Sequence, residues 1–364
     1  MFQFSIKKDS RIQEKVFSDI KIIRRILLEK FRDNVVALFL VGGFGRGEGG
    51  VIFEDNVTTV VNDYDLHMIT KRAISEREIT AICSDISQKT RVHAVDLVVQ
   101  PIYNSFTLRN TQYARDLKYG SHLIYGNKEI LQKLPSSKQL HRSEIEKLLF
   151  VRSWCFLGPI EKNFFNEKPL NKKEIFFLFQ QLSKALLALE EAWLIYQQDY
   201  SPSYLEKFDN IQKYCRDNTL IGYFEWATTF KLQPSYKIKL SPVDTYFDIK
   251  DLFLQKMLQI INKAYNRNFD SWVKYTSWYL RRLDIFFKSV ISALVYHKLS
   301  YMQLVKLYLS RILLAYAFNR EDFDKVSVEK AGQLLLGTRP SHSGNIEEIW
   351  WNLRQIAIQQ ELVK

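Results

Sequence analysis

The first hundred residues alternate between helical and strand-like spacing of their apolar positions. Residues 10–32 carry an apolar side chain every three or four positions, which predicts an amphipathic helix. The apolar stripe comprises Ile12, Val16, Ile20, Ile23 and Ile26. The next segment, NVVALFLVGG at residues 34–43, is almost continuously apolar and ends in glycine, so it predicts a buried strand.

Three further segments complete this part of the chain. Residues 51–70 predict a turn with one or two strands. Residues 75–90 predict a short helix, because Ser75 and Glu78 have the spacing of a capping box. Residues 92–101 alternate between apolar and polar positions and stop at a proline, which indicates a third strand. This order of elements predicts a small sheet of mixed pairing.

Helical spacing dominates the chain beyond about residue 135. The segment LPSSKQ at residues 134–139 is typical of a linker, and a proline-containing break lies at residues 233–246. Asn171 can cap the first of the long amphipathic segments. These segments are residues 171–200, 270–298 and 301–320.

We therefore predict an α+β protein with two domains. A small mixed-sheet domain occupies residues 1–135, and an all-α domain occupies residues 136–364. The break at residues 233–246 divides this second domain into two helical subdomains. A length of 364 residues suits such a division, because single cores rarely grow beyond about 250–300 residues.

Composition places the chain among ordinary globular proteins. Apolar residues make up 46% and charged residues 25%, and no stretch approaches the ~18 uncharged apolar residues of a membrane span. The first residues lack the apolar core of a signal peptide. Cys83, Cys155 and Cys215 are too few and too scattered for a disulfide framework or a zinc site. We expect a cytoplasmic protein without a membrane partner.

The net charge of +12 favours an anionic partner, although a generally basic composition explains it equally well. Residues 271–320 contain eight Lys or Arg and a single acid, Asp284. The aromatic residues interleaved among them would suit nucleic-acid binding. A basic solvated face over an aromatic core accounts for the same pattern, so both interpretations stay open.

The segment GGFGRGEGG, residues 42–50, concentrates glycine directly after the first predicted strand. Glycines let backbone N–H groups approach an anion, and Arg46 adds a fork of donors suited to phosphate. No Gly-Lys-Ser/Thr follows, and no apolar helix is expected here, which excludes the Walker loop and the dinucleotide fingerprint. The segment predicts a loop that cradles a triphosphate, with a flexible hairpin as the alternative.

Asp63 and Asp65 flank Tyr64 on a predicted strand, where positions i and i+2 point to one face. Two carboxylates held close together repel each other unless a cation lies between them, and oxygen ligands suit Mg²⁺. A solvated turn is the alternative. Asp96 interrupts the apolar strand at residues 92–101 and needs a partner there, which the same metal supplies. Three carboxylates on neighbouring strands predict a two-metal site for phosphoryl transfer.

This succession of strand, Gly-Gly, Gly-Arg turn, Asp-x-Asp and later Asp resembles the nucleotidyltransferase superfamily that includes DNA polymerase β. GGFGRGE followed by the Asp-x-Asp strand is most similar to its bacterial branch of aminoglycoside, protein-modifying and antitoxin-type enzymes. The resemblance covers residues 34–100. Two departures leave the subfamily open: Gly43 stands where many members have serine, and residues 49–59 are an insertion.

The resemblance implies a role for each motif residue. Gly42 and Gly43 would contact the nucleotide phosphates, and Arg46 would steady the triphosphate. Two Mg²⁺ ions would be held by Asp63, Asp65 and Asp96, and the last of these would also assist deprotonation of the acceptor.

We therefore expect a Mg²⁺-dependent nucleotidyltransferase. It would transfer a nucleoside monophosphate from a nucleoside triphosphate to a hydroxyl of a small molecule or protein and release pyrophosphate. ATP is the donor that the resemblance suggests. The alternative is a non-catalytic nucleotide- or RNA-binding protein, against which three clustered acids argue, because without a metal they would repel phosphate.

Several polar residues outside the motif have two interpretations. Glu190 and Glu191 could supply a general base, but a solvated pair is the favoured interpretation. Tyr200 and Tyr204 could line the nucleotide or acceptor pocket, but packing at a helix end is favoured. His67 could reach the site, and a structural role is favoured.

Overall fold

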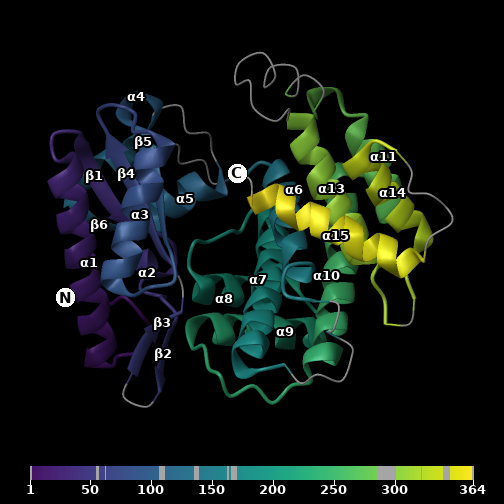
Figure 1. Cartoon of the computed structure of the whole chain (residues 1–364). Helices are drawn as coiled ribbons and strands as arrows, with labels where there is room; N and C mark the ends of the chain where they lie inside the picture. The colour runs from purple at the N-terminus through teal and green to yellow at the C-terminus, as the bar shows by residue number, and fades with distance from the viewer. Residues whose placement is uncertain are drawn as a thin grey trace. The chain divides into compact units, whose positions relative to one another are not determined.

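The computed structural model describes residues 2–54, 57–61, 63–105, 111–134, 139–161, 164, 170–285, 288, 301–320, 322–338 and 345–362. Within this part of the chain the fold is α+β, with a small mixed sheet and a largely helical remainder (Figure 1). The chain divides into two compact units. The first comprises Met1–Glu144 and Gln197–Ser235, and the second comprises Ile145–Tyr196 and Tyr236–Lys364.

The first unit contains all the named strands. They are β1 (Val35–Leu40), β2 (Val51–Glu54), β3 (Val57–Val60), β4 (Tyr64–Thr70), β5 (Val95–Pro101) and β6 (His122–Gly126). The main sheet has the order β5-β4-β1-β6, in which β1 runs antiparallel to both neighbours and β4 runs parallel to β5. The predicted mixed pairing is therefore confirmed. Strands β2 and β3 form a separate hairpin within the predicted insertion, whose tip lies outside the described residues.

Helices cover both faces of the main sheet. Those of the first unit are α1 (Ser10–Phe31), α2 (Gly42–Arg46), α3 (Glu76–Thr90), α4 (Ile102–Ser105), α5 (Gln112–Tyr119), the 3-10 helix η1 (Lys128–Lys133), α8 (Tyr204–Tyr214) and α9 (Asn218–Leu232). The isoleucine stripe of α1 packs with α3 against one face, as its spacing predicts. The opposite face packs against Leu117 of α5 and Leu131 of η1. Both halves of the capping box at Ser75 are present.

Helix α2 replaces the loop predicted for the glycine segment. Its turn is closed by the Gly45 N–H, which donates to the Val41 carbonyl at 3.1 Å. Glycine has nearly the lowest helix propensity, so the sequence predicts no helix here. Packing of Phe44 in the core of the unit provides the compensating stabilisation, because this side chain is 1% exposed.

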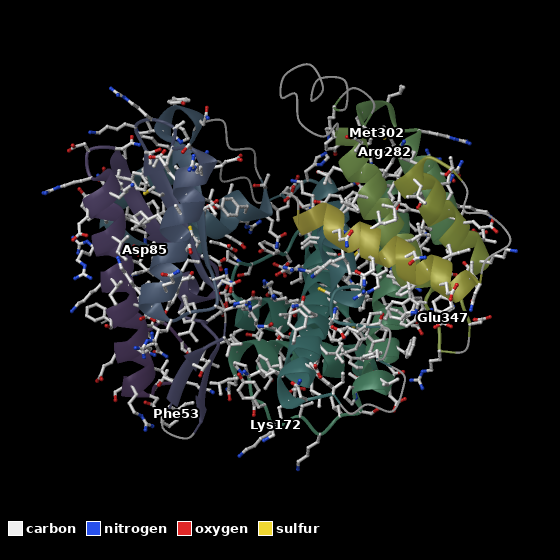
Figure 2. All side chains as sticks on the ribbon, in the orientation of Figure 1. Phe53, Asp85, Lys172, Arg282, Met302 and Glu347 are labelled. Atoms are coloured by element: carbon white, nitrogen blue, oxygen red, sulfur yellow. The ribbon has the colours of Figure 1, made fainter. Side chains whose placement is uncertain are left out.

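The named elements of the second unit are all helices. Its elements are α6 (Ser143–Arg152), the 3-10 helix η2 (Ser153–Phe156), α7 (Lys172–Gln197), α10 (Pro242–Tyr265), α11 (Trp272–Leu280), α13 (Tyr301–Ala317), α14 (Lys325–Leu336) and α15 (Ile346–Leu362). Helix α7 begins after Asn171, whose side chain accepts from two backbone N–H groups as predicted. Figure 2 shows Lys172 at the start of α7 and Glu347 in the first turn of α15.

Two predicted segments differ from the structure. The helix expected at residues 270–298 ends at Leu280 in α11, and residues 289–298 lie outside the described part of the chain. The predicted domain boundary at residue 135 also lies outside it. The helical spacing of residues 197–235 predicts that they belong to the second domain, whereas they form a compact unit with the sheet.

None of the helices in the described ranges combines the length and the apolar character needed to cross a membrane.

Candidate active site

The structure brings the three predicted aspartates together where β4 and β5 begin. In the parallel pairing of these strands, Asp65 lies directly opposite Asp96. Asp63 precedes Asp65 by two positions, directly before β4 begins. Side chains of paired residues share one face of a sheet, so these carboxylates gather on the face that α5 covers. Asp63 and Asp65 are half-buried, whereas Asp96 is exposed.

Electrostatics at Asp65 reflects this crowding. Burial raises the pKa of the Asp65 carboxyl, Lys231 lowers it, Asp96 and Asp63 raise it again, and Arg46 lowers it, with a net pKa of about 6. Two like charges thus destabilise ionised Asp65. A divalent cation would relieve this repulsion, and carboxylate oxygens are ligands that Mg²⁺ accepts, but Mg²⁺ binding stays a prediction.

Gly42 makes room for the Asp65 carboxylate. A Cβ at this position would lie 2.1 Å from Asp65 Oδ2, and the backbone has a φ of +62°, in the left-handed region that favours glycine. The Val41 N–H also donates to the Asp65 carbonyl at 2.9 Å. The start of α2 and the carboxylate strand are therefore fitted to each other, and any larger residue at position 42 would displace Asp65.

Gly43 faces the returning chain. Its carbonyl accepts from the Glu48 N–H at 2.8 Å, and a Cβ would lie 3.2 Å from the Glu48 carbonyl oxygen. The contact of Gly43 with nucleotide phosphates stays a prediction from the resemblance.

Arg46 is engaged by internal partners. Its side chain is 7% exposed, its Nε donates to Glu48 Oε2 at 3.2 Å, and its guanidinium lies 4.9 Å from the centre of the Tyr204 ring. Burial lowers the pKa of Arg46, but Tyr204, Asp116 and Glu48 outweigh this effect and hold it above its usual range. Contact with a triphosphate therefore stays a prediction for Arg46, whose observed role is to tie α2 to α8.

Glu48 completes that tie. Its carboxylate accepts from the Ser203 hydroxyl at 2.6 Å and from the Tyr204 N–H at 3.0 Å, at the first turn of α8. A carboxylate at a helix N-terminus satisfies backbone donors that the helix itself leaves unpaired. The Arg-x-Glu of the glycine segment thus binds a helix that begins more than 150 residues later.

Sequence reasoning missed two lysines near the site. Lys207 Nζ lies 4.3 Å and Lys231 Nζ 5.7 Å from the centre of the Tyr204 ring. Lys231 is also the strongest charged neighbour acting on Asp65. No motif marks either residue, since both come near Tyr204 only through the return of α8 and α9 to the first unit.

The tyrosines before and within α8 have distinct environments. Tyr200 is buried and donates from its hydroxyl to Asp116 Oδ1 at 2.7 Å, which agrees with the favoured packing role. Tyr204 is half-buried, with Arg46, Lys207 and Lys231 around its ring. This ring gathers three cations, of which Arg46 and Lys231 also act on Asp65.

His67 has a structural environment. It is fully buried, its Nδ1 lies 2.7 Å from the Tyr113 hydroxyl, and burial lowers its pKa to about 4. A neutral imidazole follows at physiological pH. Tyr113 in turn has a pKa above its usual range because of burial and the nearby Asp65 and Asp116 charges.

Within the described ranges, no three His, Cys, Asp or Glu side chains are arranged closely enough, as placed, to coordinate one metal ion together. The fit of the aspartates to Mg²⁺ therefore rests on their gathering, on the electrostatics at Asp65 and on the space that Gly42 leaves.

The solvated interpretation of Glu190 and Glu191 is wrong. Glu190 is fully buried and Glu191 is 9% exposed, within α7 of the second unit. Helix α7 has apolar neighbours on nearly all sides in this stretch, so the pair is drawn into the core. A role as general base stays a prediction.

The basic segment at residues 271–320 buries three of its aromatic side chains, whereas Trp278 is half-buried and Tyr316 is exposed. Trp272, Tyr275 and Tyr279 are buried, and Arg282 (labelled in Figure 2) lies against Tyr279 and bonds Glu146 at 2.7 Å. Stacking on bases needs exposed rings, so these three aromatic side chains provide no nucleic-acid platform.

No protein-family model matches the chain, and no curated protein matches its sequence. The resemblance to nucleotidyltransferases therefore rests on the motif residues of the sequence and stays a prediction.

Proposed function

We propose that the protein is a Mg²⁺-dependent nucleotidyltransferase. The observation that carries this proposal is the pairing of Asp65 with Asp96 beside Asp63, against a glycine whose Cβ would collide with the Asp65 carboxylate. Asp96 and Asp63 raise the pKa of Asp65, so their gathering is unfavourable for the ionised carboxylate and favours a site that takes a cation. A metal–triphosphate complex has the charge and the oxygen chemistry to be that ligand.

Each charged residue has a role in this proposal. Asp63 and Asp65 would hold two metal ions, and Asp96, which is exposed, would complete the site on the side open to an acceptor. Two bound Mg²⁺ ions would supply charge neutralisation at the transferred phosphoryl group and a lowered pKa of the attacking hydroxyl. Lys231 would attract the phosphates that carry the remaining negative charge.

The reaction balances as a substitution at the α-phosphate. The acceptor hydroxyl oxygen forms a bond to the α-phosphorus, the bond to the bridging oxygen breaks, and pyrophosphate leaves with that electron pair. The hydroxyl proton passes to Asp96 or to water. ATP is the donor suggested by the resemblance, and the acceptor is a hydroxyl of a small molecule or a protein.

The alternative of an RNA-binding protein has less support. It depends on the basic residues 271–320, where the aromatic side chains named above are buried and Arg282 is paired with Glu146. A protein that binds nucleotide without transferring it stays distinct from the proposal, because it would release no pyrophosphate.

Calorimetry with a non-hydrolysable ATP analogue tests the proposal. We expect binding to require Mg²⁺ in the wild type, and Asp63→Asn with Asp65→Asn to abolish the metal-dependent part. Asp85→Asn is the matched control, because Asp85 is an exposed carboxylate on α3 (Figure 2) paired with Lys89. Equal affinity of the wild type with and without metal would overturn the two-metal site.

Transfer itself needs a second measurement. Cell extract incubated with the protein and α-labelled nucleoside triphosphates should yield a labelled product and pyrophosphate together. Metal-dependent nucleotide binding without either product would leave a binding protein and exclude the transferase.

A further inference from the structure

Tyr64, the residue between the two aspartates of the Asp-x-Asp pair, anchors a chain of buried hydrogen bonds. Its side chain is fully buried on the sheet face opposite the carboxylates, and its hydroxyl donates to Asp19 Oδ2 at 2.8 Å. Asp19, on α1, is 2% exposed and also accepts from Lys15 Nζ at 2.6 Å. Lys15 donates in addition to the Thr90 carbonyl at 2.9 Å, at the end of α3.

An apolar side chain at position 64 would have filled this core without any polar group. A buried hydroxyl and a buried carboxylate are unfavourable unless they are paired, and here they are paired with each other and with Lys15. A directional hydrogen bond fixes where the tyrosine ring ends, whereas a purely apolar contact allows sliding. The chain therefore has a means of fixing β4 relative to α1 and α3.

The other side of the Tyr64 ring contacts the glycine segment. Phe44 of α2 packs on it with ring centres 5.0 Å apart. Phe44 itself fits only because position 49 is glycine, since a Cβ there would lie 2.1 Å from the Phe44 ring. Tyr64 thus connects α1 to the strand of the aspartates and to the helix that begins with Gly42.

We propose that Tyr64 is a positioning residue for the metal site. Held by Asp19 and Lys15, it fixes the start of β4 and thereby the spacing of the Asp63 and Asp65 carboxylates. This inference rests on the proposed function. Because side chains alternate along a strand, movement of the Tyr64 ring is transmitted through the backbone to both neighbouring aspartates.

A positioning role and a purely structural role of Tyr64 differ in their effect on the selectivity between Mg²⁺ and Ca²⁺. Mg²⁺ demands near-ideal octahedral geometry at short distances, whereas Ca²⁺ accepts flexible coordination. Loss of the anchor should therefore weaken Mg²⁺ binding more than Ca²⁺ binding. A residue that only stabilises the core would leave this ratio unchanged.

Tyr64→Phe is the decisive variant, and Tyr246→Phe is its matched control. Tyr246 is also fully buried, and its hydroxyl donates to the Phe156 carbonyl at 2.7 Å in the second unit. Each variant removes one oxygen and one buried hydrogen bond. In separate titrations followed by calorimetry, Mg²⁺ or Ca²⁺ would be added to the full chain in the presence of a non-hydrolysable ATP analogue.

We expect Tyr64→Phe to weaken Mg²⁺ binding by roughly 10-fold, the lower end for loss of a residue that orients metal ligands. Ca²⁺ binding should change less, and Tyr246→Phe should match the wild type for both ions. Asp19→Ala, which removes the acceptor of the Tyr64 hydroxyl, should show the same bias toward Mg²⁺ loss. It also decides the matter if Tyr64→Phe does not fold.

Each outcome has a distinct meaning. A wild type that binds no Mg²⁺ with the nucleotide overturns the proposed function together with this inference. Wild-type Mg²⁺ binding with an unchanged Mg²⁺ to Ca²⁺ ratio in the folded variants removes only the positioning role of Tyr64.

Discussion

The two compact units differ in how they accommodate charge in protected places. In the second unit, each buried cation meets an acceptor: Lys250 donates to the Phe318 carbonyl at 2.6 Å, and Arg354 donates to the Leu157 carbonyl at 2.9 Å. In the first unit, burial raises the pKa of Asp65, Lys231 lowers it, and the neighbouring acids Asp96 and Asp63 raise it again. A buried charge that is bonded to an acceptor contributes to the fold. Like charges that gather in one place indicate instead a site that binds a ligand of opposite charge.

The largest expected effect comes from removing the like charges themselves. Asp63→Asn with Asp65→Asn should lower turnover by several kcal/mol of transition-state stabilisation, or about 10³-fold, because the metals lose their ligands. Stability should stay equal or rise, since repulsion is relieved. Pyrophosphate release and thermal unfolding measure the two quantities, and Asp85→Asn is the control for each. Near-normal turnover in the double variant would show that the gathered carboxylates of the first unit do not form a catalytic site.

Arg46→Ala tests whether a buried, paired charge in the first unit contributes to the free energy of unfolding, as expected for the paired cations of the second unit. Arg46 and Glu48 have side chains 7% and 5% exposed, so removal of the arginine leaves a buried carboxylate without its ion pair. We expect a loss of about 3–5 kcal/mol in the free energy of unfolding, measured with urea. Arg46→Lys should restore part of it, because a point charge replaces a planar fork. Arg46→Ala with wild-type stability would show that the pair contributes little to the fold.

Lys231→Met should chiefly affect the nucleotide. Lys231 acts on Asp65 from α9, and a charge-assisted contact to phosphate contributes about 1.5–3 kcal/mol, or roughly 10- to 100-fold in the KM for the triphosphate. Lys213→Met is the control, since Lys213 is exposed and lies 3.5 Å from Asp199. Equal KM values in both variants would exclude Lys231 from the phosphate site.

The smallest effect concerns pH. The pKa of Asp65 is raised to about 6 in the folded state from 3.8 in the unfolded chain. The folded state therefore holds its proton more tightly, and stability falls as pH rises from about 4 to 6. Thermal unfolding in the presence of a chelator should show this slope in the wild type and a shallower one in Asp65→Asn. Saturating Mg²⁺ with the nucleotide analogue should reduce the difference, because the metal then favours the ionised carboxylate.

Local spacing was enough to predict the elements that carry the carboxylates. Alternation predicted that Asp65 and Asp96 lie on strands, and the structure has both on paired strands. These properties depend on neighbours within a few residues, where periodicity is informative.

Contacts between distant segments could not be predicted in the same way. Glu48 binds the first turn of α8, and Lys231 reaches Asp65, only because the chain returns to the first unit after residue 196. Helix α2 also escaped prediction, because tertiary packing overrides the low helix propensity of glycine. The burial of Glu190 and Glu191 was not predicted, because a pair of acids among apolar helix positions has the same local pattern whether it is solvated or buried.

The return of residues 197–235 to the first unit also sets an order of events during synthesis. Glu48 leaves the ribosome 155 residues ahead of Ser203, its hydrogen-bond partner. At ~5–20 residues per second, this interval lasts roughly 8–30 s. Once β4 and β5 have been made, they exist without the helix that secures their neighbouring segment until the residues of α6 and α7 have also been made. The first unit to begin translation is thus completed only after part of the second has been synthesised.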